Sequence, residues 1–192
     1  VSQNYVELLL TEAIEKHCDI VKCGYYEFNN TNGKIIKKVK YYNRTMNYSD
    51  EYLMRVKGHG CMCVLKRELF KNIRFPINYL YEDMIIRLLI YPLCNKINTI
   101  SSILYFYRVN NASLSRSISN KTNFKSLSQF FLLKDIINMR KKLEFKDDEL
   151  FKRFILSELT TNMFLRIRHL DKETIYDVFL ASCELIENID FN

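Results

Sequence analysis

The sequence predicts an α/β fold, with a mixed sheet flanked by helices and an all-helical C-terminal part. Residues 5–16 place apolar side chains at helical spacing, and residues 19–28 and 96–109 are rich in strand-forming residues. Toward the C-terminus the apolar residues recur at helical spacing only. We therefore expect an α/β part over residues 1–119 and a helical subdomain over residues 120–192.

The first elements are predicted to be a helix and a hairpin. The helix over residues 5–16 carries its apolar residues at helical spacing: Val6, Leu9, Leu10, Ala13 and Ile14. Residues 19–28 follow as a strand. The segment Asn29–Gly33 has the Asn and Gly residues of a tight turn, so residues 35–42 are expected to pair with the preceding strand as a hairpin.

The second strand of this hairpin and the residues after it are strongly basic. Cations and tyrosines are interleaved there: Lys34, Lys37, Lys38, Lys40, Tyr41, Tyr42 and Arg44. Such interleaving is typical of nucleic-acid-binding surfaces, but lysines also mark solvated edge strands that avoid pairing with another chain. We favour the solvated face and expect no nucleic-acid partner, because no nucleic-acid-binding motif is present.

A loop with a single histidine follows the hairpin. Ser49 is predicted to cap a short helix. Gly58 and Gly60 are predicted to end this helix before the strand Cys61–Leu65. His59 lies between these glycines. It is a loop residue first and a candidate ligand-contacting residue second.

The central stretch of the chain runs from Arg74 to Asp83 and leads into an apolar helix. Pro76 lacks an N–H and cannot sit inside a helix. Glu82 and Asp83 open a helix over residues 82–91, whose buried face is predicted to hold Met84, Ile85, Leu88 and Leu89. Two interpretations stay open. The acids are ordinary first-turn residues stabilised by the helix dipole, or one of them accepts a proton from a bound hydroxyl.

The C-terminal part is predicted to contain three amphipathic helices. The first has a face of Phe124, Leu127, Phe130, Phe131, Lys134 and Ile137; the second of Leu150, Phe151, Phe154, Ile155 and Leu159; the third of Ile175, Val178, Phe179 and Ile186. Asp147 and Asp148 stand at the start of the second helix, and Asp171 is expected to cap the third. We interpret the aromatic stripes as core, with a dimer interface or a membrane surface as the alternatives.

Composition bounds the class of protein. With 48% hydrophobic and 27% charged residues among 192, the chain is that of a folded domain. No apolar run is long enough to cross a membrane, and the polar start is not a signal peptide. The net charge of +7 suits nucleic acid, anionic membrane surfaces or phosphorylated small molecules without choosing among them. The six cysteines form no C-x-x-C pair and are interpreted as buried, reduced thiols of a cytoplasmic protein.

Three runs of residues together resemble one family. RELFKNIRFPINYLYEDMIIRLLI resembles the second half of family-2 glycosyltransferases, where a basic-Leu-Phe segment, an RFP turn and an ED pair recur in this order. ILYFYRVNNASLSRS is similar to the same family's Y-x-Y-R … S strand and loop, and NYVELLLTEAIEKHCDIVKCGYYEFN to the helix and strand after its metal-binding acids. The likeness covers about residues 3–117 and implies a partial GT-A-like (nucleotide-diphospho-sugar transferase) fold.

The resemblance implies roles for individual residues. Asp83 would be the catalytic base, with Glu82 orienting it or the acceptor, and His59 would lie near the acceptor end of the site. Three residues would lie near the donor diphosphate or order the loop over it: Arg108, Ser113 and Arg116. A planar guanidinium suits phosphate oxygens, but either arginine is equally well explained by pairing with a surface acid.

The implied activity is that of a bacterial inverting glycosyltransferase. It would move a sugar from a nucleotide-diphospho-sugar to a hydroxyl of a cell-surface glycan or a lipid-linked acceptor, in the cytoplasm or at the inner face of the membrane. The family's Mg²⁺ or Mn²⁺ is held by an Asp-x-Asp pair. No such pair occurs in this sequence, so no metal ligand is assigned here, and the metal- and nucleotide-binding half is expected outside this chain.

Two explanations of this departure remain. The chain is the C-terminal part of a longer enzyme, or it is a degenerate remnant that acts as a non-catalytic interaction module. In either case we expect the 192 residues alone to bind nucleotide-sugar poorly and to be inactive.

Overall fold

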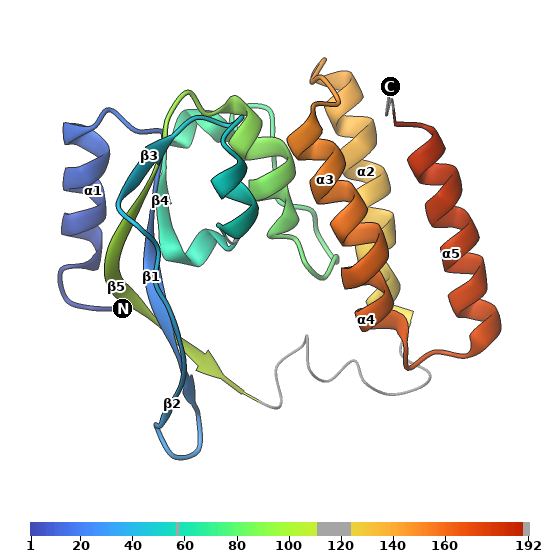
Figure 1. Ribbon diagram of the computed structural model, residues 1–192, viewed down its shortest axis with the longest axis horizontal. Helices are drawn as coiled ribbons and strands as arrows, with labels where there is room; N and C mark the ends of the chain where they lie inside the picture. The colour runs from blue at the N-terminus through green and yellow to red at the C-terminus, as the bar shows by residue number, and fades with distance from the viewer. Residues whose placement is uncertain (57, 111–123, 190–192) are drawn as a thin grey trace. The chain divides into compact units, whose positions relative to one another are not determined.

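The structure, a computed structural model, describes residues 1–56, 58–110 and 124–189. The described residues form two compact units (Figure 1). One unit holds residues 1–74 and 89–110, and the other holds residues 75–88 and 124–189. The predicted boundary between residues 119 and 120 lies outside the described residues. The stretch that carries Glu82 and Asp83 therefore belongs to the same unit as the C-terminal helices.

The described part of the first unit contains a five-stranded mixed sheet. Its strands are β1 (Ile20–Asn29), β2 (Ile35–Val39), β3 (Arg44–Met46), β4 (Cys63–Leu65) and β5 (Ile97–Val109). The order is β2-β1-β5-β3, and β4 also pairs with β1. β1 and β5 are parallel, whereas β2 and β4 run antiparallel to β1, and β3 runs antiparallel to β5. The predicted hairpin, the long strands and the mixed sheet are confirmed, whereas only Cys63–Leu65 of the predicted strand Cys61–Leu65 is extended.

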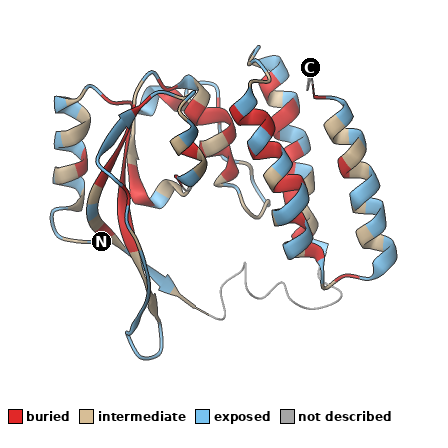
Figure 2. Cartoon of the chain, viewed as in Figure 1, coloured by how far each residue is buried: buried red, intermediate tan, exposed pale blue. Residues whose placement is uncertain are grey.

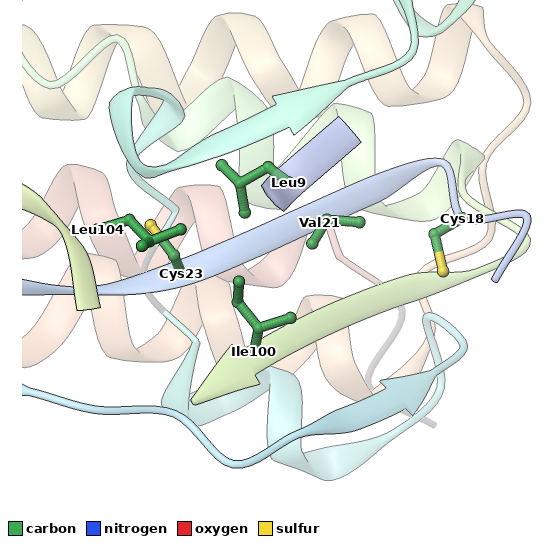
Figure 3. Packing of buried hydrophobic residues seen from close by; sticks show 6 residues of the cluster. All are labelled: Leu9, Cys18, Val21, Cys23, Ile100 and Leu104. Carbon is green, nitrogen blue, oxygen red and sulfur yellow. The ribbon is translucent and has the colours of Figure 1, made fainter. Parts of the chain in front are cut away.

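The core of this unit forms where α1 (Tyr5–Glu15) covers the sheet. Leu9 of α1 is fully buried and packs with side chains of β1 and β5 and the segment before β1 (Figure 3): Cys18, Val21, Cys23, Ile100 and Leu104. Full burial of one such leucine contributes about 1.5–3 kcal/mol. This cluster fixes α1 on the sheet.

The predicted apolar face of α1 is wrong in part. Val6 and Ile14 are more than 60% exposed and Leu10 is half exposed, and Figure 2 shows α1 mostly in tan and pale blue. The half-buried partners of Leu9 include Tyr5 and Leu8. Because a single helix on the outer face of a sheet buries only a narrow stripe, the broad apolar periodicity overestimated the contact.

Among the described residues of the first unit, four short 3₁₀ helices connect the strands: η1 (Glu51–Arg55), η2 (Gly60–Met62), η3 (Arg67–Phe70) and η5 (Tyr91–Leu93). The cap of η1 is Asp50 and not the predicted Ser49. The Asp50 carboxylate accepts a hydrogen bond from the Tyr52 backbone N–H at 2.9 Å, whereas the Ser49 hydroxyl donates to the Asn47 side chain at 2.7 Å. A carboxylate also suits the positive helix N-terminus better than a hydroxyl.

The second unit is helical. Its elements are η7 (Phe124–Leu127), α2 (Ser128–Lys142), α3 (Glu149–Ser157), η8 (Glu158–Asn162), α4 (Met163–Ile167) and α5 (Lys172–Glu187), together with the first residues of η4 (Ile86–Ile90). The predicted buried faces of α3 and of the helix after Asp83 are confirmed, since every residue named for them is buried. Asp148 caps α3, and Asp171 caps α5 as predicted.

The predicted face of the first C-terminal helix is wrong in part. Phe124 and Phe131 are more than half exposed, and α2 instead turns Leu132, Leu133 and Ile136 inward. Arg140 on this inner face is fully buried. Its guanidinium donates to the Leu88 carbonyl at 2.8 Å and lies over the Phe151 ring, 3.7 Å from the ring centroid. Sequence periodicity assigned the aromatic residues to the inner face and left out this arginine, which the Leu88 carbonyl and the Phe151 ring stabilise in the core.

The prediction of buried, reduced thiols is confirmed for four of the six cysteines. The six cysteines are free thiols, and four of them are buried: Cys18, Cys23, Cys63 and Cys94. Burial raises the pKa of the Cys23 thiol to about 11, which keeps it protonated. Cys61 is exposed, contrary to the prediction. Within the described part of the chain, every helix is too short or too polar to cross a membrane.

Candidate functional site

The turn before Glu82 has a backbone that side chains rarely adopt. Asn78 and Tyr81 have positive φ angles of 68° and 67°. For a bulky aromatic residue such as Tyr81 this conformation is strained, and strain of this kind concentrates at functional sites. The helix then starts with backbone hydrogen bonds of 3.1 Å to the carbonyls of Tyr81, Glu82 and Asp83. Glu82 and Asp83 therefore form the first turn, as predicted.

Two π-helical segments, η4 and η8, carry charged side chains that lie close together. Arg87 lies in η4, and Glu158 opens η8. The widened turn of a π-helix is rare and is frequent at functional sites. Each segment presents a charged side chain, and these two charges meet: Arg87 Nη1 lies 3.8 Å from Glu158 Oε1.

Glu158 is the centre of a buried ionic cluster. It is only 6% exposed. Arg166 Nη1 lies 3.8 Å from its Oε2, and the buried Gln129 side chain donates a 2.8 Å hydrogen bond to the same oxygen. A buried carboxylate requires such partners, since removal of its charge from water alone costs roughly several kcal/mol. Removal of either arginine would leave part of this charge uncompensated.

The pKa of Glu158 is raised. Burial is the main cause; Arg166 and Arg87 act in the opposite direction, and the negative charge of Asp83 adds to the rise. Arg166, which stacks on Tyr81 and lies 3.8 Å from Glu158, links the first turn of the helix to η8.

Aromatic rings hold the two arginines in place. The Arg166 guanidinium carbon lies 3.6 Å from the Tyr81 ring centroid, and that of Arg87 lies 4.5 Å from the Phe154 ring centroid. A guanidinium stacked on an aromatic face gains about 0.5–2 kcal/mol. Since Tyr81 directly precedes Glu82, helix α4 fixes the position of the acidic turn.

The two acids of this turn differ in environment. Glu82 is exposed, whereas Asp83 is half-buried and interacts electrostatically with the Glu158 cluster. A half-buried carboxylate on a fixed turn is able to accept a proton from a hydroxyl placed against it. Asp83 is therefore the more enclosed of the two acids, and Glu82 is the more accessible one.

His59 lies in the first unit, in a loop held by a buried lysine. Lys22 is fully buried in β1, and its ammonium donates a 2.7 Å hydrogen bond to the His59 carbonyl. The Cys63 thiol makes a 3.1 Å contact with the Gly60 carbonyl. The hydrogen bonds from Lys22 and Cys63 therefore fix the loop backbone around His59, and the residue itself is half-buried.

Arg108 lies near the end of β5 and is exposed. It is in register with Phe28 of β1, whereas the lysine under His59 is Lys22. Six residues of strand span about 20 Å, so the structure does not bring Arg108 and His59 together. Glu82 and Asp83 belong to the other unit. Ser113 and Arg116 lie outside the described residues.

The described residues do not fit a divalent cation. Among residues 1–56, 58–110 and 124–189, no three His, Cys, Asp or Glu side chains lie together as a ligand set. The expectation of Mg²⁺ or Mn²⁺ concerned acids outside this chain, and it stays a prediction.

Sequence reasoning missed four charged residues of these clusters: Lys22, Arg87, Glu158 and Arg166. Lys22 and Arg87 did carry a signal, since each is a lone cation in an otherwise apolar run. A buried cation must be paired, so such a position points to a network. Glu158 and Arg166 carried none, because their partners are distant in the sequence.

The chain is similar in sequence to a streptococcal glycosyltransferase. It is 29% identical over 133 residues to the glycosyltransferase GlyA of Streptococcus pneumoniae serotype 4 (strain ATCC BAA-334 / TIGR4), a match that covers 63% of this chain and 19% of that protein. The likeness supports a glycosyltransferase. No family model matches the sequence. The mixed α/β fold is compatible with part of a glycosyltransferase, and the chain spans only about a fifth of the relative's length.

Proposed function

We propose that this chain is the acceptor-side part of an inverting, GT-A-like glycosyltransferase of family 2. It acts with a nucleotide-diphospho-sugar donor, and the acceptor is a hydroxyl of a cell-surface glycan or glycolipid. The observation that carries the proposal is the Glu82–Asp83 turn, held by Arg166, which stacks on Tyr81 and pairs with the buried Glu158. The likeness to a streptococcal glycosyltransferase supports the same reaction class.

Asp83 is the base in this proposal. Its carboxylate takes the proton of the acceptor hydroxyl while the acceptor oxygen forms a bond to the anomeric carbon. The bond from that carbon to the diphosphate oxygen breaks, and its electron pair leaves with the nucleotide diphosphate. A single displacement assisted by one carboxylate inverts the anomeric centre. Glu82 orients the acceptor, and His59, Ser113, Arg108 and Arg116 remain the candidates for substrate contact.

The site of action is proposed to be the cytoplasm, at the inner face of the membrane when the acceptor is lipid-linked. A divalent cation is expected to be held by acids outside this chain. A homodimer through the C-terminal helices remains a prediction, to which the exposed Tyr176, Phe179 and Leu180 of α5 give a candidate surface.

The test compares the full-length gene product with its Asp83→Asn variant. Sugar transfer and donor hydrolysis are measured over a panel of nucleotide-sugars with Mn²⁺ present. Loss of a general base lowers kcat about 10²- to 10⁴-fold while the protein stays folded. The matched control is Asp177→Asn, which makes the same chemical change on an exposed position of α5 and should retain activity.

Three outcomes are informative. A selective loss in Asp83→Asn supports the base assignment. Equal activity of Asp83→Asn and the wild type contradicts it. Absence of turnover with every donor, in the full-length wild type, would favour the non-catalytic interaction module.

A further inference from the structure

One face of the sheet near the β1–β2 turn collects cations and apolar side chains. This hairpin face comprises Tyr26, Phe28, Ile35, Lys38, Phe106 and Arg108. Tyr26 is in register with Lys38 on β2 and with Phe106 on β5; Phe28 is in register with Ile35 and Arg108. Residues opposite each other share a face, as do Tyr26 and Phe28, which are two apart along β1. Ile35 and Lys38 are three apart along β2, and a register shift between Glu27 and Phe28 takes up the extra residue.

The hairpin face is positively charged and apolar. It holds two cations and no acid, and its Ile35 and Phe106 are 59% and 44% exposed. The far end of β2 is pale blue in Figure 2. The opposite face of the same strands differs, because there Lys37 pairs with Glu27 at 3.7 Å. Exposed apolar side chains that gather on one face beside cations form a candidate interaction surface.

The turn of the hairpin satisfies its own backbone. Asn29 and Lys34 are joined by a 2.9 Å hydrogen bond, and Gly33 N–H donates to the Asn29 carbonyl at 2.9 Å. The Asn29 and Asn32 side chains accept from the backbone N–H groups of Thr31 and Lys34 at 2.7 and 3.0 Å. Backbone groups that are already paired cost little to move into a less polar environment. The turn is therefore suited to an interface of low polarity.

Two of the three rings of the hairpin face already have neighbours. Tyr26 and Phe106 stack on each other with centroids 5.9 Å apart, and Lys38 Nζ lies 5.7 Å from the Tyr26 ring centroid. A nucleic-acid base stacks on a free ring face, so these contacts make the face less suited to bases. Pairing of β2 with a second copy is opposed by its lysines.

We propose that the hairpin face docks on an anionic lipid surface. Ile35, Phe28 and Phe106 enter the boundary between headgroups and acyl chains, and Lys38 and Arg108 lie among the anionic headgroups. Apolar and aromatic residues beside Lys and Arg are the composition of peripheral membrane contacts. Each cation near such a surface contributes about 1 kcal/mol. This docking goes beyond the proposed transferase activity, and the variants that test it leave out Arg108, which is also a candidate for substrate contact.

The test is vesicle cosedimentation of the full chain. The protein should bind vesicles of phosphatidylcholine mixed with phosphatidylglycerol, release as salt is added, and not bind phosphatidylcholine alone. Lys38→Gln should weaken binding about fivefold, the factor for about 1 kcal/mol. Ile35→Ser should weaken it about tenfold, since an isoleucine leaves the apolar layer. Both positions are exposed, and far-ultraviolet circular dichroism checks that the variants fold.

Two matched controls separate the hairpin face from charge or hydrophobicity in general. Lys37→Gln removes the same charge from the opposite face of β2 and should change binding about twofold or less. Ile14→Ser makes the same apolar-to-polar change on α1, where Ile14 is 63% exposed, and should bind like the wild type. Equal loss in the controls overturns the proposal, as does equal binding to neutral vesicles. Binding to single-stranded RNA without binding to vesicles overturns it in favour of a nucleic-acid surface.

Discussion

Arg166 and Tyr81 form one of the contacts that tie the acidic turn to the C-terminal helices, with 3.6 Å between the guanidinium carbon and the ring centroid. The Tyr79 hydroxyl forms another, since it donates a 2.7 Å hydrogen bond to Asp135 of α2. Tyr81 keeps a φ of 67° in its contact with Arg166. A strained residue persists only where its surroundings hold it, and Arg166 supplies that restraint. The position of Asp83 thus depends on a residue of α4.

This contact predicts a measurable coupling. In a double-mutant cycle of Tyr81→Leu and Arg166→Met, the interaction energy should be about 0.5–2 kcal/mol, because the pair is partly desolvated. Urea denaturation of the four proteins measures it. The control pair is Arg44 and Tyr52 in the first unit, 5.2 Å apart and more exposed, for which a smaller coupling is expected. Additive effects at Tyr81 and Arg166 would refute the restraint.

Glu158 predicts a pH dependence. Burial, the largest cause, raises its pKa above 4.5 in the folded state, so the folded protein binds this proton more tightly than the unfolded chain. Stability from this group is therefore lost as pH rises from 4.5 through the raised pKa. The free energy of unfolding of Glu158→Gln should gain on that of the wild type over this window. A difference that is constant with pH would show that Glu158 titrates normally.

Asp19 predicts the opposite dependence. Burial disfavours its charge, but the Lys66 ammonium at 2.7 Å and the backbone N–H groups of Lys96 and Asn95 lower its pKa below 3.8. The folded protein therefore binds this proton less tightly, and the stabilisation is present above pH 3.8 and lost as pH falls. At neutral pH, Asp19→Asn should cost about 1.5–3 kcal/mol, the range for hydrogen bonds to a charged group. Urea denaturation should show this cost shrinking in acid.

Gly24 predicts a packing defect. A Cβ at this position would lie 2.6 Å from the Val39 carbonyl oxygen and 3.0 Å from Ile103 Cγ1, so the strands β1 and β2 must separate. Gly24→Ala should lower the free energy of unfolding by about 1–3 kcal/mol. Gly33→Ala is the contrasting variant, since a Cβ there meets nothing within 4 Å and only the positive φ is strained, at about 1 kcal/mol. Thermal unfolding that ranks Gly33→Ala as the worse variant would contradict the close approach.

The strands and the positions of the main helices could be predicted because their signals are local. The buried faces of α1, α2 and α5 were not predicted correctly, and Phe179 on the predicted face of α5 is 60% exposed. The residues of β1 and β5 are strand formers, and the hairpin turn has its own Asn and Gly. The same holds for the apolar face of α3. Local pattern failed where burial depends on a distant partner. Arg140 lies in the core because the Leu88 carbonyl accepts a hydrogen bond from its guanidinium. No sequence pattern relates these two distant residues.

The candidate site shows the same division. Glu82 and Asp83 were placed correctly in the first turn, because Pro76 and the apolar run mark its position. The charges that surround Asp83 were not foreseen. Arg87 is a cation in an apolar helix, so a buried partner could have been predicted for it. The identity of that partner, Glu158, could not, because the two residues are distant in the sequence.

The separation of Tyr81 and Arg166 along the chain has a consequence for biosynthesis. Arg166 follows Tyr81 by 85 residues (positions 81 and 166). At a translation rate of about 5–20 residues per second, the ribosome needs about 4–17 s to reach Arg166 after it has added Tyr81. During that interval the nascent acidic turn has no guanidinium to stack on, and Met84 and Ile85 have no helices to cover them. Chaperone binding to the emerging chain should therefore concentrate on residues 75–88 and end once α4 has left the exit tunnel.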